Sequence, residues 1–224
     1  MIFNNGRLRH KRVLPGFSIS LGVSLLFVSL ILLLPTTGLI MQTSQMSWAE
    51  YWGVITDPRV LASYKVTILS ALAASLFNCL FGLLLAWVLV RYEFPGKRLL
   101  DALVDLPFAL PTAVAGITLA TLYAENGQIG SLLAEIGIKV AYTPLGIVVA
   151  MIFTSIPFVV RTVQPVLEEL SNDEEEAGMT LGATDSAVFW RVILPSLWPA
   201  LMVGTALSFT RSLGEFGAVI FIAG

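Results

Sequence analysis

Residues 66–90 read VTILSALAASLFNCLFGLLLAWVLV, a run of 25 residues without a charged side chain. A helix needs about 20 mainly apolar residues to cross the hydrocarbon core of a bilayer, so this stretch predicts a transmembrane helix. The rest of the chain has a similar character, since 56% of its 224 residues are hydrophobic, 12% are charged and the mean hydropathy is +0.84. This composition excludes a soluble globular domain, whose surface would need more charge.

Apolar stretches of comparable length recur along the chain and predict the number of spans. We expect five, at residues 14–41, 60–90, 99–123, 140–160 and 192–224. The expected fold class is therefore an all-α polytopic membrane protein built as one helical bundle. Five spans that start from a cytoplasmic amino terminus would leave an unanchored apolar carboxyl end outside. For this reason we expect that the chain lacks a last span.

Basic residues are distributed unevenly over the segments that connect these spans. The amino-terminal tail, residues 1–13, holds four, the connection 91–98 holds three and the segment 161–191 holds two. The opposite connections hold only Arg59 and Lys139, apart from Lys65 inside a span. By the positive-inside tendency, the amino-terminal tail and the long hydrophilic segment face the cytoplasm.

The residue types that metal binding and catalysis require are nearly absent. Cys79 and His10 are the only residues of their kinds, which excludes both a disulfide framework and a Cys/His metal site within one chain. No phosphate loop of the G-x-x-x-x-G-K-[ST] type is present, and neither is a G-x-S-x-G or H-E-x-x-H pattern. We therefore expect no catalytic residue, no metal and no cofactor.

The longest hydrophilic segment between spans, residues 167–191, reads LEELSNDEEEAGMTLGATDSAVFWR. Ser171, with Glu174 three residues later, predicts a capping box that opens a short helix, and Gly182 can end or bend that helix. Thr184 can cap a second short helix before the chain re-enters the membrane. A plain acidic connector needs only a few residues, so two capped helices favour a docking surface.

This segment also resembles the EAA motif of ABC importer permeases, which runs Glu-Ala-Ala, three residues, Gly, nine residues, Ile, any residue, Leu-Pro. The matching residues are Glu176, Ala177, Gly178, Gly182, Leu194 and Pro195, with Gly178 in place of the second alanine and Val192 in place of the isoleucine. The resemblance implies a type I, MetI-like transmembrane domain over residues 14–224. It also implies that segment 167–191 couples the chain to a separate ATPase, so that the chain itself is not an enzyme.

Other stretches resemble particular importers. Residues 103–116 (LVDLPFALPTAVAG) and 209–218 (FTRSLGEFGA) are similar to sulfate/thiosulfate and molybdate permeases, while residues 11–17, 46–52 and 155–166 are similar to the T-type sulfate/thiosulfate permease. That family has a sixth span, which we expect to be missing here. The resemblance implies sulfate or thiosulfate import across the bacterial inner membrane, with molybdate or tungstate as the alternative. The implied partners are two copies of an ATPase, a second homologous permease and a periplasmic binding protein, with no role for nucleic acid.

Four residues of the third and fifth spans are candidates for the pathway or its gate. Arg211 and Glu215 lie four residues apart, on one helical face. An isolated arginine at the bilayer centre costs at least ~2.5–3.5 kcal/mol, so the pair should face the bundle interior or a wet cavity. Pro107 and Pro111 each remove a helix hydrogen bond. The alternative for Arg211 and Glu215 is a purely structural ion pair, and the alternative for the two prolines is a simple packing kink.

Two further function classes can be compared with this interpretation. A secondary transporter would suit broken helices with intramembrane charge, but it predicts an internal repeat that the sequence does not contain and needs no docking segment. A membrane-embedded hydrolase would need a clustered nucleophile and base. Asp101 and Asp105 share a face at the cytoplasmic end of the third span, where we expect them to pair with Lys97 or Arg98.

Overall fold

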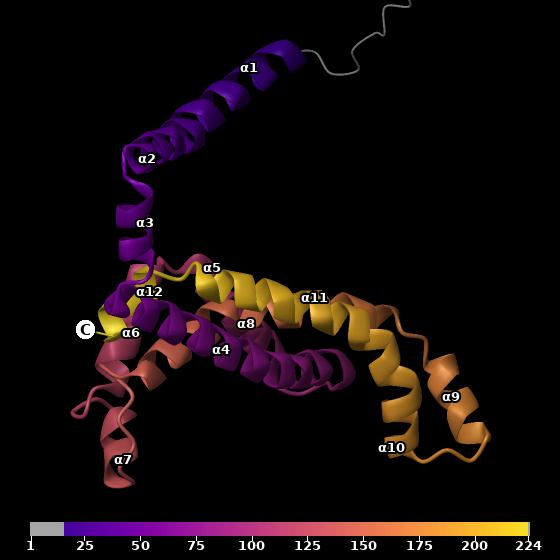
Figure 1. Cartoon of the computed structure of the whole chain (residues 1–224). Helices are drawn as coiled ribbons and strands as arrows, with labels where there is room; N and C mark the ends of the chain where they lie inside the picture. Colours follow the sequence, from indigo (N-terminus) through magenta and orange to yellow (C-terminus); the bar gives the residue numbers. More distant parts are fainter. Residues whose placement is uncertain (1–15, 224) are drawn as a thin grey trace, which may run out of the picture. The chain divides into compact units, whose positions relative to one another are not determined.

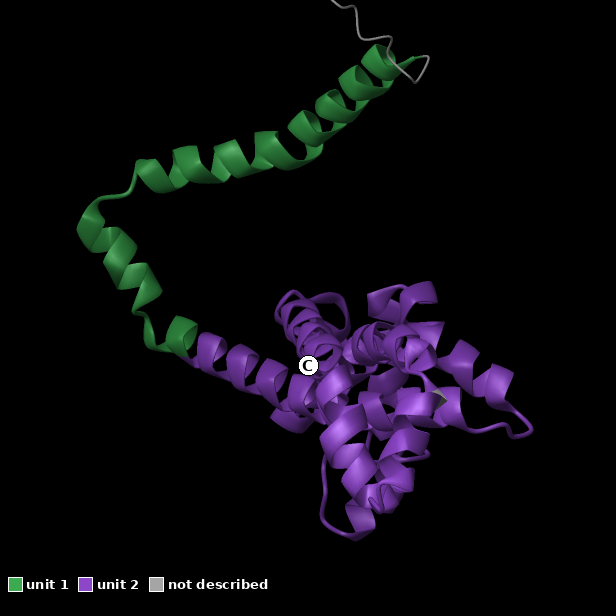
Figure 2. Ribbon diagram, turned by 90° about the vertical axis from the view of Figure 1, so that its right-hand side faces the viewer, with its two compact units in different colours: residues 1–61 green, residues 62–224 purple. Residues whose placement is uncertain are grey.

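The structure, a computed structural model, describes residues 16–223. The basic tail at residues 1–13 and the terminal Gly224 lie outside the described residues. The elements are α1 (Phe17–Val28), η1 (Ser29–Leu33), α2 (Leu34–Ser44), α3 (Trp48–Ile55), α4 (Pro58–Arg91), α5 (Lys97–Ala109), α6 (Thr112–Tyr123), α7 (Gly130–Glu135), α8 (Pro144–Glu169), α9 (Asn172–Thr180), α10 (Asp185–Val188), η2 (Phe189–Ile193), α11 (Leu194–Leu213) and α12 (Gly217–Ala223). They form two units, residues 1–61 and 62–224, which Figure 2 distinguishes and which we describe separately.

The first unit contains one long apolar helix, in which α1, η1 and α2 run on continuously over Phe17–Ser44. Pro35 has no N–H to donate to the preceding turn, and the chain accommodates the gap by widening to the π-helical turn η1. None of the side chains in this helix is buried, as suits a helix surrounded by lipid. The shorter α3 begins at Ser47, which forms a capping box with Glu50. The donated hydrogen bonds lower the pKa of Glu50 below its ordinary value.

Three long helices, α4, α8 and α11, form the body of the second unit. They meet at Val159 of α8, whose side chain is fully buried. A Cβ added to Gly82 of α4 would lie 2.7 Å from Cγ1 of Val159, and one added to Gly204 of α11 would lie 3.0 Å from its Cα. Glycine is therefore needed on both sides for the helices to approach so closely. In Figure 1, α9 and α10 lie at one end of this body, and α6, α7 and α12 lie at the other.

The third predicted span is interrupted, at the prolines that the sequence singled out. Residues 99–123 fold as two helices, α5 and α6, that are bent by 116° at the break between them. Pro111 precedes α6 and restricts Leu110 to an extended backbone, with ψ of 136°, so the helix cannot continue through this point. The described residues thus contain four helices that are long and apolar enough to cross a membrane, or up to five spans if the bent pair counts as one.

The fifth predicted span also differs from the structure, because α11 ends at Leu213 and does not run on to the end of the chain. After a short break, α12 continues and packs on α6 and α8, with Ala218 and Ile222 fully buried. Gly116 of α6 faces Ala218, where a Cβ would lie 2.7 Å from the Ala218 Cα. The break therefore turns the last helix into the bundle.

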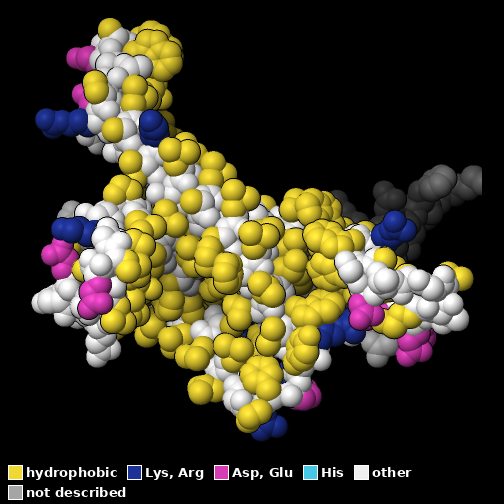
Figure 3. Space-filling view, turned by 90° about the horizontal axis from the view of Figure 1, so that it is seen from below, with side chains coloured by type: hydrophobic (Ala, Val, Ile, Leu, Met, Phe, Trp, Pro, Cys, Tyr) yellow, Lys and Arg dark blue, Asp and Glu magenta, His cyan; other side chains and the backbone are white. Residues whose placement is uncertain are grey.

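The surface agrees with a membrane location. On the face shown in Figure 3, hydrophobic side chains cover the middle of the bundle and charged side chains gather towards its margins. Large apolar side chains are exposed along the straight spans, such as Leu80 of α4 at 67% and Val203 of α11 at 54%. Apolar exposure on this scale along long helices is expected where lipid is the solvent.

Candidate functional site

The hydrophilic segment after α8 begins with the capped helix α9. The hydroxyl of the N-cap residue Ser171 accepts a hydrogen bond from the Asp173 N–H at 3.1 Å, and the Glu174 N–H donates instead to the Ser171 carbonyl at 3.3 Å. At the other end, the N–H groups of Gly182 and Ala183 donate to carbonyls of the last turn at 2.9 and 3.1 Å. This is a Schellman cap, in which Gly182 has φ of 86°, a left-handed conformation that glycine adopts without steric cost.

The residues of the EAA-like motif on α9 divide into an exposed group and a packed one. Glu176, Ala177 and Gly182 are exposed, and a Cβ at Gly182 would meet no atom within 4 Å. Gly178 is half-buried, and a Cβ there would lie 3.3 Å from Cγ2 of Val188 in α10. Gly178 thus allows α9 to pack closely on α10. Glu176, Ala177 and Gly182 lie on the outer face of the segment, where a partner protein can reach them.

The second helix of this segment does not stop before the membrane, contrary to the prediction. It begins at Thr184, whose hydroxyl accepts from the Ala187 N–H at 3.3 Å, and continues as one helix over Asp185–Leu213. Pro195 has no N–H, so the preceding turn widens to the π-helical η2, where the Leu194 N–H donates to a carbonyl five residues back. Leu194 is half-buried and Pro195 is exposed. Both lie inside the continuous helix that leads into the membrane.

An ion pair joins α9 to α4. Arg91, the last residue of α4, pairs with Glu175, and the two side chains are only 19% and 17% exposed. The Arg91 guanidinium lies 5.4 Å from the ring centroid of Trp87, which meets the ring of Phe189 in η2 edge to face, with centroids 5.6 Å apart. Sequence reasoning missed this contact because 84 residues separate the two ionic partners.

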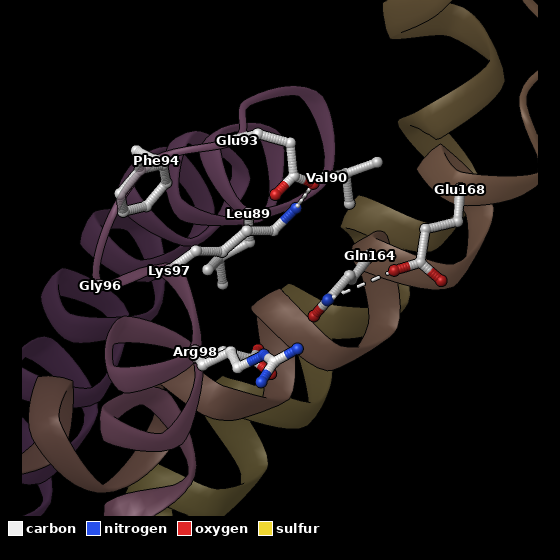
Figure 4. A pocket seen from close by; sticks show the side chains of 10 residues that line it. Leu89, Val90, Glu93, Phe94, Gly96, Lys97, Arg98, Gln164 and Glu168 are labelled. Carbon is white, nitrogen blue, oxygen red and sulfur yellow. Dashed lines mark hydrogen bonds and ion pairs between the residues drawn. The ribbon is translucent and has the colours of Figure 1, made fainter.

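A pocket of ≈ 570 Å³ lies at the same end of the bundle, where α4, the following loop and α5 face α8. Figure 4 shows Lys97 paired with Glu93 at 2.6 Å, and Gln164 donating to Glu168 at 3.4 Å on the facing helix. Arg98 extends from α5 towards α8. Since charges of both signs line this pocket, it does not provide a strongly cationic site for an anion.

Asp101 and Asp105 bind Arg161 of α8, so the predicted pairing with Lys97 or Arg98 is wrong. Arg161 Nη1 lies 2.7 Å from Asp101 Oδ1, and Arg161 Nη2 lies 2.6 Å from Asp105 Oδ2. The two carboxylates lie four residues apart on one face of α5, and that face is turned towards α8. A single guanidinium therefore fastens α5 to α8 with charge-assisted hydrogen bonds.

Arg211 and Glu215 form an ion pair at the end of α11, with Arg211 Nη1 lying 2.6 Å from Glu215 Oε2. The Glu215 side chain is only 1% exposed, whereas that of Arg211 is 31% exposed. Glu215 Oε1 also accepts from the Ala218 N–H at 2.9 Å, in the first turn of α12. Glu215 therefore holds the break between α11 and α12 as well as neutralising Arg211.

The candidate prolines lie at or near the other helix break. Pro107 is half-buried inside α5, and Pro111 is exposed at the start of α6. The two breaks adjoin each other, since a Cβ added to Gly217 would lie 3.0 Å from Cβ of Thr112. The structure thus brings the two candidate groups to neighbouring interruptions of helical backbone.

A buried polar cluster joins α4, α8 and α11 in the interior. The Asn78 Nδ2 donates to the hydroxyls of Ser155 and Ser208, at 2.9 and 3.2 Å. The Ser208 and Ser212 hydroxyls lie 3.0 and 3.1 Å from that of Ser155, and all four side chains are fully buried. Sequence reasoning did not single out Asn78, although an amide in an otherwise apolar span was an available signal.

Among residues 16–223, no group of three or more His, Cys, Asp or Glu side chains is arranged to hold a metal ion. Cys79 is a half-buried free thiol in α4. Several acidic side chains pair with basic partners, as in α5 and at the end of α11, and others lie on the exposed surface of α9. What these groups offer chemically is helix contact and charge pairing.

Comparison with known proteins adds a family match. Residues 78–224 match the family model described as binding-protein-dependent transport system inner membrane component. The chain is 70% identical to the sulfate transport system permease protein CysT of Salmonella typhimurium and to that of Escherichia coli, over 96% of this chain and 77% of each of those proteins. It is 50% identical to the same-named protein of Synechocystis sp., over 93% of this chain and 73% of that protein.

A solved structure has a similar fold. It is the crystal structure of a bacterial ABC transporter involved in the import of the acidic polysaccharide alginate, and the similarity extends over 93% of this chain and 77% of that chain, with a TM-score of 0.74. The two sequences are only 17% identical, so this similarity supports the fold and no particular substrate.

Proposed function

We propose that this chain, which belongs to the family of binding-protein-dependent transport system inner membrane components and within it to the sulfate transport system permeases, carries sulfate or thiosulfate through the membrane in an ATP-driven importer. The observation that carries this proposal is the similarity, over almost the whole chain, to permeases named for sulfate transport. The capped helix α9, exposed at one end of the bundle, supports the ATP-driven mechanism because such an importer needs a docking element there.

ATP is bound and hydrolysed by a partner subunit in this proposal. The exposed residues Glu176, Ala177 and Gly182 form the surface that docks on the ATPase, and Gly178, Leu194 and Pro195 shape the helices behind that surface. Two copies of the ATPase, a second homologous permease and a periplasmic sulfate- or thiosulfate-binding protein complete the complex. The half-buried packing of Gly178 on α10 supports this role, because it couples α9 to the helix that enters the membrane.

The proposed orientation in the bacterial inner membrane places the amino terminus and α9 on the cytoplasmic side. The support is the excess of lysine and arginine in the tail, in the connection 91–98 and in the segment 161–191. The arrangement of the second unit agrees with it, since α9 and α10 lie at the opposite end of the bundle from α7 (Figure 1).

The anion route passes close to the two adjoining helix breaks. Irregular backbone at membrane depth is tolerated where it packs on protein or lines a cavity. Pro111 lies at the first break, with Pro107 in the helix before it, and Arg211 and Glu215 lie at the end of the helix before the second break. Arg211 is partly exposed but neutralised by Glu215, so it can attract a passing dianion only weakly. Strong selectivity is then left to the binding protein, and weak attraction allows rapid release.

Growth on sulfate tests the proposal. Cells that lack their own sulfate permease, but retain the ATPase and binding protein, should grow on sulfate as sole sulfur source when this permease is supplied. Excess thiosulfate should compete with sulfate for uptake, and excess molybdate should compete much less. Failure to grow, with the protein present in the membrane and the ATPase bound to it, would refute sulfate as the cargo.

A further inference from the structure

We infer that the Arg91–Glu175 pair, together with Trp87 and Phe189, is the joint through which movement of α9 reaches α4. This inference rests on the proposed function, because it assumes that α9 is moved by an ATPase. It adds a route into α4, beside the continuous helix that leads from α10 into α11 and in contact with that helix at Phe189.

Glu175 is the residue through which α9 contacts α4. Of the α9 residues whose burial is described, only Glu175 and Gly178 are half-buried, and the others are exposed. These two lie three residues apart, on one face of the helix. Gly178 packs against Val188 of α10 and Glu175 pairs with Arg91 of α4, so each contact leads to a different transmembrane helix.

The Arg91 side of the joint is held more firmly than a surface ion pair. Both ionic side chains are less than one-fifth exposed, so solvent screens their attraction only in part. The guanidinium lies over the Trp87 ring, one helical turn back, and Trp87 contacts Phe189 of η2. The joint therefore also includes the π-helical turn, which is the irregular point of the other route.

From this joint, α4 extends without interruption to the interior of the bundle. Asn78 lies 13 residues before Arg91 in the same helix, which corresponds to about 20 Å at 1.5 Å per residue. There it donates hydrogen bonds to Ser155 of α8 and Ser208 of α11. A displacement applied at Arg91 can thus reach the contact of all three long helices through one rigid rod.

Reversing the charges of Arg91 and Glu175 distinguishes transmission of α9 movement to α4 from docking of the ATPase on α9. The complete complex, reconstituted in vesicles, is compared with R91E, E175R, the double exchange R91E/E175R, and the matched control E174R, which makes the same charge change at an exposed position of α9. We expect each single reversal to lower sulfate uptake per ATP hydrolysed by about tenfold while the ATPase still co-purifies, and the exchange to restore most of it. E174R should behave like the unaltered complex.

A spectroscopic measurement tests the joint independently of the cargo. Spin labels are placed on Leu84 of α4 or Met202 of α11, which are 57% and 40% exposed, and their mobility is compared with and without a non-hydrolysable ATP analogue. In R91E, the response of the α11 label should persist and that of the α4 label should be lost.

The outcomes separate this inference from the proposed function. Absence of sulfate uptake by the unaltered complex would refute the proposed cargo, while the spin labels would still report on the joint. The joint is refuted if R91E responds like the unaltered complex, if the exchange is no better than the single reversals, or if the single reversals release the ATPase. E175Q, which keeps the shape of the side chain, provides the same comparison if a reversed charge prevents folding.

Discussion

Replacement of Gly182 should uncouple ATP hydrolysis from transport, and the structure predicts by how much. Gly182 has φ of 86° and closes the Schellman cap of α9. A side chain in this left-handed conformation costs about 1–2 kcal/mol. This cost lowers the equilibrium ratio of the capped to the uncapped end of α9 by a factor of about 5–30. A Cβ here would meet no atom within 4 Å, so within the chain the cost comes from the backbone alone.

Three variants divide this effect into two parts. Asparagine tolerates the left-handed region better than other non-glycine residues, so Gly182→Asn should keep most of the coupling, while Gly182→Ala should lower the coupling by up to the factor given above. Gly182→Leu has the same backbone cost as alanine but adds bulk to the exposed face. Any further loss from alanine to leucine therefore measures contact with the ATPase.

The assay is sulfate uptake per ATP hydrolysed by the reconstituted complex, with recovery of the ATPase as the control for assembly. The predicted order of coupling is glycine, asparagine, alanine, leucine. If Gly182→Ala couples as well as glycine does, the cap has no role in transmission. If asparagine and alanine are equally impaired, the backbone conformation is not the cause.

Further predictions concern the interior contacts and the orientation. Asn78→Ala should destabilise the permease by roughly 1 kcal/mol, about 0.6 kcal/mol for each of the two N–H donors that the amide shares among its three acceptors, and an unchanged melting temperature in detergent would contradict this. Glu215→Gln, which keeps a cap for α12 but breaks the ion pair, should be milder than Glu215→Ala in a protease-protection assay; equal effects would mean that the cap is unimportant. Arg161→Gln should loosen α5 from α8 and destabilise the fold more than a surface change does, which the same melting assay tests. A periplasmic reporter enzyme should be active when fused after Gly127 and inactive after residue 172, and the reverse pattern would overturn the orientation.

The sequence predicted the parts of the fold that depend on local pattern. Apolar length located the long helices, and Ser171 and Gly182 located the two ends of the capped helix α9. Both signals are local, because membrane insertion and helix capping depend on a few neighbouring residues.

The features that sequence reasoning did not predict depend on contacts between distant residues. Asp101 lies four residues from Lys97 but pairs with Arg161, because α5 turns that face towards α8. Glu175 reads as one of several acidic residues at a helix start, and only the fold brings it to Arg91.

The sequence predicted that the prolines interrupt helix hydrogen bonding, but it did not predict how far each helix bends. Pro111 was expected to disturb a span, but the 116° angle between α5 and α6 could not be read from it, because α6 also packs against α12, which lies far along the sequence. The helix capped by Thr184 was expected to be short and separate from the next span, but a single widened turn absorbs the missing hydrogen bond of Pro195 and the helix continues. The cost of a missing N–H can be read from sequence, whereas the way the surrounding structure compensates for it cannot.

The proposed function requires this chain to be the membrane pathway of a sulfate importer that is driven through α9. The most direct test is uptake of radiolabelled sulfate into vesicles that contain this permease with its second permease and ATPase, supplied with binding protein outside and ATP inside. We expect uptake that requires both ATP and binding protein and that is abolished when residues 172–182 are replaced by a flexible linker. Uptake that continues without ATP, or that survives this replacement, would contradict it.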